Sequence, residues 1–239
     1  MAHGGLQDVM ILDAVSFGVI AVVIAVLLRP RFPRQLSEGR SVMADLRAGF
    51  GYLRRTPSIR ALVVALSGLN LYVSPVLAVG LVLRTQDAGW SATSLGVFEA
   101  TSGVAAAIGA LIVLRWKPPD SARTGLLVLV AQAAACAAIG SVPYPVIFVS
   151  MATIGVTAGI ASALLSGYFT AAVDESYLSR CTSIVLLTDQ ALMPAVMTGF
   201  GVLIAGVGVA TACLIAGAMF AAARLAAADR PTPVSVIPG

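Results

Sequence analysis

Long apolar runs separated by short polar segments dominate the chain. Seven of these runs are long enough, at about 1.5 Å of rise per residue, to cross the hydrocarbon core of a bilayer as helices. The predicted spans are 10–28, 59–83, 92–114, 124–141, 145–170, 182–205 and 207–225. The pattern therefore predicts an all-α integral membrane protein with seven transmembrane helices.

A basic connection, residues 29–58, separates the first span from the others. Together with Arg60 it holds eight of the fifteen lysines and arginines, against only Glu38 and Asp45 as acids. Segments of this kind stay on the cytoplasmic side of a membrane. The loops that share this side hold fourteen basic residues, whereas the opposite side holds only Arg84. We therefore expect a multi-pass plasma-membrane protein with a short extracytoplasmic head at 1–9 and a cytoplasmic tail at 227–239.

The basic connection also contains an amphipathic pattern. Four apolar side chains recur at spacings of three and four residues: Met43, Leu46, Phe50 and Leu53. This spacing predicts a helix over 41–55 that lies along the cytoplasmic face of the membrane.

The composition excludes several classes of function. Hydrophobic residues make up 59% of the chain and charged residues 11%, which is incompatible with a fully water-facing surface. The net charge of +4 comes from arginines beside apolar spans, so it does not indicate a nucleic-acid partner. Cys136, Cys181 and Cys213 are scattered and His3 stands alone, so neither a disulfide framework nor a metal site is expected. No nucleophile with a base and no phosphate-binding loop is found, and we expect neither an enzyme nor a cofactor.

Two carboxylates lie well inside apolar spans, whereas Asp13 lies near the outer end of the first span, where it can reach water. Glu99 and Asp189 each lie in the first half of a predicted helix, where burying a charge costs about 2.5–3.5 kcal/mol on insertion scales. Each should therefore face the bundle interior, water or a partner. They occupy the second helix of two successive groups of three, which favours a 1 + (3+3) arrangement with the weak internal symmetry of secondary transporters.

A stripe of small residues follows the predicted span at 145–170. Every fourth position is small: Gly155, Gly159, Ala163 and Gly167. Such stripes let helix backbones approach closely within membranes, so these residues are expected to pack against another helix.

Several motifs together resemble the major facilitator superfamily. They are Leu12–Phe17, Gly51–Pro57, Gly89–Ser91 with Leu95–Gly96 and Gly109–Leu111, and Ser179–Arg180 with Pro194 and Gly199. Within this superfamily the chain resembles the bacterial enterobactin-exporter-like, or transmembrane secretion effector, branch, and the resemblance covers nearly all of the chain. It implies the sixth to twelfth helices of such a transporter. The turn at 115–123 keeps basic residues but lacks a clear copy of the superfamily's glycine-aspartate-arginine signature.

This resemblance implies a function. The chain would be the carboxyl-terminal portion of a secondary active, proton-coupled exporter of small lipophilic or siderophore-like molecules, incomplete without an amino-terminal half. Glu99 and Asp189 would couple proton movement, unless they are structural carboxyls that bond to other helices. The candidate cavity-lining residues are Asn70, Tyr72, Ser74 and Tyr168. The alternative is a non-transporting membrane fragment, inert or regulatory through helix pairing.

Overall fold

The computed structural model describes residues 3–28, 42–116, 118–140 and 143–228. Within these ranges the regular structure is entirely helical, which confirms the all-α prediction. The chain divides into two units, Met1–Ser41 and Val42–Gly239, and each is described by itself. Residues 29–41 of the basic connection, Lys117 and the predicted tail from 229 onward lie outside the described residues.

The described residues of the first unit form the helix α1 (His3–Leu28). It begins seven residues before the predicted span at 10–28, within the stretch expected to form a short head. Residues 3–9 include Gly4 and Gly5, which disfavour a helix, but they contain no proline, so the helical hydrogen bonds can continue toward the amino terminus. Apolar side chains such as Phe17 and Val22 are more than half exposed within this unit.

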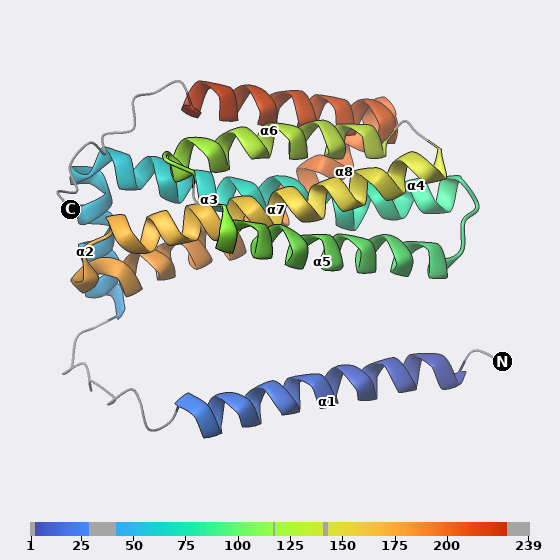
Figure 1. Cartoon of the computed structure of the whole chain (residues 1–239). Helices are drawn as coiled ribbons and strands as arrows, with labels where there is room; N and C mark the ends of the chain where they lie inside the picture. Colours follow the sequence, from blue (N-terminus) through green and yellow to red (C-terminus); the bar gives the residue numbers. More distant parts are fainter. Residues whose placement is uncertain (1–2, 29–41, 117, 141–142, 229–239) are drawn as a thin grey trace. The chain divides into compact units, whose positions relative to one another are not determined.

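The second unit is a helical bundle (Figure 1). Its elements are α2 (Val42–Arg55), α3 (Pro57–Pro75), the π-helix η1 (Val76–Leu81), α4 (Val82–Asp87), α5 (Ala92–Arg115), α6 (Ser121–Ile139), α7 (Tyr144–Ala172) and α8 (Glu175–Ala228). Four described helical stretches are long and apolar enough to cross a membrane: 57–87, 92–115, 144–172 and 175–223. These stretches support a membrane protein.

The stretch that contains the second predicted span is irregular at η1. The chain stays helical from Pro57 to Asp87, but it widens into π-helical turns directly after Pro75. Proline has no backbone N–H, and its ring disfavours a regular α-helical bond to the preceding turn. Pro75 and Val76 are buried, so this irregular backbone faces protein, as expected for π-bulges within helices.

The long helix α8 consists of two limbs that meet at Gly208. The backbone there has φ 80° and ψ 162°, and the chain reverses direction (Figure 1). This conformation is accessible essentially only to glycine. The predicted division of the last two spans at Gly206 was therefore wrong by two residues, because neighbouring glycines look alike in a sequence.

We expect Gly208→Ala to destabilise the bundle by about 1–3 kcal/mol, because alanine strains this backbone conformation. No atom lies within 4 Å of a Cβ built on Gly208, so the cost is conformational and not a steric clash. Gly206→Ala is the matched control, since that position has equal space and no positive φ. Thermal unfolding in detergent should show a lower Tm for the first variant only, and equal Tm values would contradict the assigned reversal point.

Helix α2 lies across one end of the bundle (Figure 1) and differs from the prediction in one respect. The helix expected over 41–55 is present, but its apolar stripe is divided between two environments. Leu53 is buried and Leu46 packs beside it, whereas Met43 and Phe50 are 73% and 50% exposed. Contacts with α8 turn the helix so that half of the stripe faces inward.

Helices α5 and α7 pack through small residues. A Cβ on Gly155 would collide with the carbonyl oxygen of Ser102, and one on Gly159 with that of Ala106. Ala163 is half-buried, but no atom lies within 4 Å of a Cβ built on Gly167. The close-packed stripe is therefore shorter than predicted, because α7 extends beyond its contact with α5 at this end.

The segment between the predicted spans 145–170 and 182–205 is almost entirely helical. Only Val173 and Asp174 separate α7 from α8, because Asp174 accepts hydrogen bonds from the backbone N–H of Ser176 at 3.0 Å and from its hydroxyl at 2.8 Å. These bonds lower the pKa of the Asp174 carboxyl. Arg180 thus belongs to α8, where it pairs with Asp45 at 3.1 Å.

Candidate functional site

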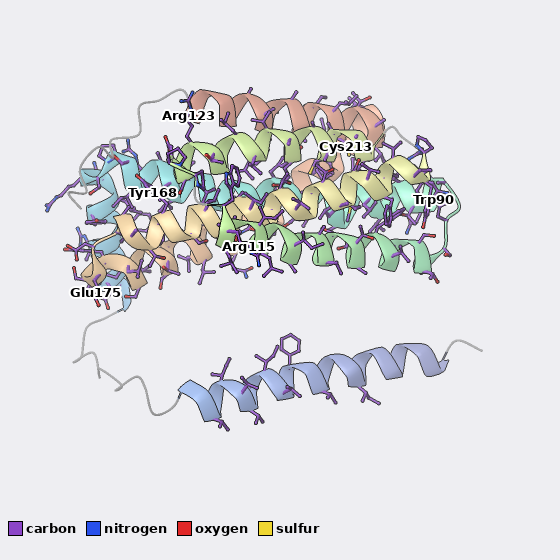
Figure 2. All side chains as sticks on the ribbon, in the orientation of Figure 1. Trp90, Arg115, Arg123, Tyr168, Glu175 and Cys213 are labelled. Carbon is purple, nitrogen blue, oxygen red and sulfur yellow. The ribbon has the colours of Figure 1, made fainter. Side chains whose placement is uncertain are left out.

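Two apolar clusters fill the bundle, one toward each end. The first, near α2, includes Leu53, Leu62, Leu165 and Ile184. The second, near the start of α5, includes Val76, Phe98, Met151 and Phe200. Figure 2 shows Glu175 toward the first end and Trp90 toward the other.

Polar side chains, most of them buried or half-buried, lie between the two clusters. On α3 they occur between Val63 and Val76, and on the first limb of α8 between Ile184 and Phe200. Helices α6 and α7 each contribute one polar side chain at the corresponding position. We call this set the polar layer: Ser67, Asn70, Tyr72, Gln132, Thr157 and Asp189.

The clearest contact in the polar layer joins α3 to α8. Asn70 Nδ2 donates a hydrogen bond of 2.9 Å to Asp189 Oδ2. Asn70 is exposed and Asp189 half-buried, whereas Asp189 Oδ1 is buried and has no hydrogen-bond partner in the described part of the chain. A carboxylate among apolar helices needs compensation from hydrogen bonds, charge or protonation. In the described part of the chain, the Asp189 carboxylate accepts one hydrogen bond, from Asn70.

Other members of the polar layer also have spare hydrogen-bonding capacity. Gln132 is fully buried, and neither atom of its amide finds a partner among the described residues. The Ser67 hydroxyl also has no partner among the described residues. The Tyr72 hydroxyl lies against the Cys136 thiol, and the Tyr72 and Phe220 rings stack with their centroids 4.1 Å apart. Thr157 differs, because its hydroxyl donates to the carbonyl oxygen of Thr153 at 2.6 Å. These unpaired polar groups would gain hydrogen bonds from a polar ligand.

The structure separates the predicted site residues. Asn70, Tyr72 and Asp189 share the polar layer, and Ser74 lies half-buried one turn beyond Asn70. Glu99 is exposed on α5, and no hydrogen bond or ion pair links it to the rest of the described chain. Tyr168 packs against the first apolar cluster, away from the layer.

Sequence reasoning missed Ser67, Gln132 and Thr157. Gln132 is the only amide side chain in the predicted span at 124–141, and that isolation was a usable signal. Ser67 and Thr157 gave none, because serine and threonine are common in membrane helices and bond to their own backbone.

Other parts of the bundle offer less support for a functional site. An apolar groove of about 460 Å³ runs between α5 and α7, lined by residues that include Val97, Val104 and Phe148, and no member of the layer lines it. In the described ranges no group of three or more His, Cys, Asp or Glu side chains is arranged to hold a metal ion. The polar layer therefore remains the candidate site.

Comparisons with protein-family profiles, curated proteins and solved structures found no match. The resemblance to the major facilitator superfamily thus stays a prediction from the motifs of the sequence.

Proposed function

We propose that the chain is part of a secondary active membrane transporter that exchanges protons for a small lipophilic or siderophore-like solute. The observation that carries this proposal is Asp189, a carboxylate within an apolar helix whose buried oxygen has no described partner and whose other oxygen binds Asn70. Ionisable groups in such positions mark ion or substrate pathways in membrane proteins.

The coupling follows from the cost of charge in a low-dielectric site. When Asp189 is protonated, the neutral carboxyl is tolerated among apolar helices and its proton can bond locally. When the proton leaves, the charge must be compensated by water, by Asn70 or by a donor group of the solute. Proton loss and solute binding at this carboxylate are therefore linked.

One helical unit supplies one wall of such a pathway. Alternating access requires a second wall, which we propose to be another helical half facing Asn70 and Asp189. Glu99, exposed on α5, is a second candidate for contact with that half. In this arrangement residues 29–58 and the carboxyl terminus lie in the cytosol and the amino terminus lies outside the plasma membrane.

A non-transporting role through helix pairing is the competing function. It is favoured by the apolar side chains exposed on α5, such as Val104 and Leu111 at 64% and 61%. Lipid would cover these side chains equally well. Their exposure therefore distinguishes the two candidate functions less clearly than the polar layer does.

Proton movement in everted membrane vesicles tests the proposal. Vesicles are prepared from cells that express the full chain, alone or with an amino-terminal half of a major facilitator transporter, and a pH-sensitive dye reports proton efflux. A panel of lipophilic cations and siderophore-type chelates is added to the vesicles. We expect at least one solute to cause proton efflux when the chain is present, alone or with the amino-terminal half, and no efflux in vesicles without the chain. No solute-dependent movement in either arm would favour the non-transporting fragment.

A further inference from the structure

The outer face of α2 combines two exposed apolar side chains with two arginines. Met43 and Phe50 are 73% and 50% exposed, and Arg47 and Arg54 are exposed beside them. At 100° per residue, these four positions fall within an arc of about 60° around the helix. We call this arc the outer face of α2.

The opposite face of α2 is fixed to the bundle. Leu53 is buried in the first apolar cluster, and Asp45 pairs with Arg180 of α8 at 3.1 Å. The rings of Tyr52 and Tyr177 stack at 4.5 Å and are 8° from parallel. The only acid of α2 thus points to α8, and no acidic residue of α2 lies on the outer face.

This combination is chemically selective. Guanidinium groups bind phosphate oxygens through paired hydrogen bonds, and large apolar side chains on the same narrow face gain free energy only when they leave water. A nucleic acid or an acidic protein surface would occupy the arginines but leave Met43 and Phe50 in water. The headgroup region of a bilayer satisfies both kinds of side chain.

The position of α2 agrees with this chemistry. The helix lies across one end of the bundle (Figure 1), and the ends of membrane-spanning helices lie at the level of the lipid headgroups. We propose that the outer face of α2 is a binding site for anionic phospholipids, with Arg47 and Arg54 on the phosphates and Met43 and Phe50 among the upper acyl chains. The site does not depend on transport activity.

Native mass spectrometry of the full chain in detergent can measure its Kd for added phosphatidylglycerol and phosphatidylcholine. We expect tighter binding of phosphatidylglycerol, and a roughly 30-fold weakening in the variant Arg47→Gln/Arg54→Gln, which removes two basic contacts. Arg115→Gln/Arg123→Gln is the matched control, because it removes two exposed arginines elsewhere in the bundle. Met43→Gln/Phe50→Gln should weaken binding of both lipids while keeping the salt dependence.

The pattern of losses decides the outcome. Weakening confined to the α2 variants supports the site. Equal weakening by the control arginine pair would show that net charge alone attracts the lipid, and that result would overturn the proposal. Unchanged binding in the α2 arginine variant would also overturn it, provided that circular dichroism shows the helices intact.

Discussion

Replacing Gly155 and Gly159 together by alanine is expected to force α5 away from α7 and to lower stability by about 3 kcal/mol or more. Each new methyl group would meet backbone atoms of α5, which cannot move aside as a flexible side chain can. Within a membrane, helix association depends on such close packing because lipid is as apolar as the helix surface. Thermal unfolding in detergent measures the loss.

The matched control for this double variant is Gly167→Ala. A methyl group there meets no atom within 4 Å, so the better helix propensity of alanine should leave stability unchanged or raise it by up to about 1 kcal/mol. Opposite signs for the two changes support the assigned packing. A comparable loss at Gly167, or no loss in the double variant, would show that α5 and α7 are packed differently.

Asp189→Asn is expected to abolish solute-driven proton movement, reducing it to the level of vesicles without the chain. Asparagine is nearly isosteric with aspartate and retains an oxygen that can accept the hydrogen bond from Asn70, but it cannot carry a proton across. Asp189→Glu should keep part of the activity. The measurement is the dye signal in everted vesicles for any solute that moves protons with the unaltered chain.

Asp174→Asn serves as the control for that experiment. Asp174 lies between α7 and α8 and binds the start of α8, and asparagine is an equally good residue at that position. Activity should therefore survive the change. Persistent coupling in Asp189→Asn would remove Asp189 from the mechanism even if the chain transports.

Periodicity and length predicted most helices but not their exact ends. Helix α5 matches its predicted span closely, because Ser91 accepts a hydrogen bond from the Ser94 amide at its start. Helix α6 begins at Ser121, three residues before the prediction, because the Asp120 side chain accepts from the Arg123 amide. The reversal at Gly208 depends on one backbone conformation, which no apolar pattern encodes.

The candidate site was only partly predictable. A carboxylate within an apolar run is conspicuous in a sequence, so Asp189 could be predicted as a site residue. Its hydrogen-bond partner Asn70 is 119 residues away in the chain, and no local sequence pattern pairs the two. Gln132 joins the polar layer only because α6 turns that face inward. Similarly, α2 divides its apolar stripe because Arg180 and Tyr177 of α8 hold its other side.

Cysteine accessibility tests the central claim most directly, which is that water reaches the Asn70–Asp189 end of the polar layer inside a membrane-embedded bundle. Cysteine is introduced at Asn70 or Asp189 in a chain whose Cys136, Cys181 and Cys213 are replaced by alanine, and native vesicles are treated with a charged, membrane-impermeant thiol reagent. Both positions should react, whereas Val202→Cys, 69% exposed but on an apolar surface, should be shielded by lipid. Labelling at Val202 with none at Asn70 or Asp189 would contradict the account.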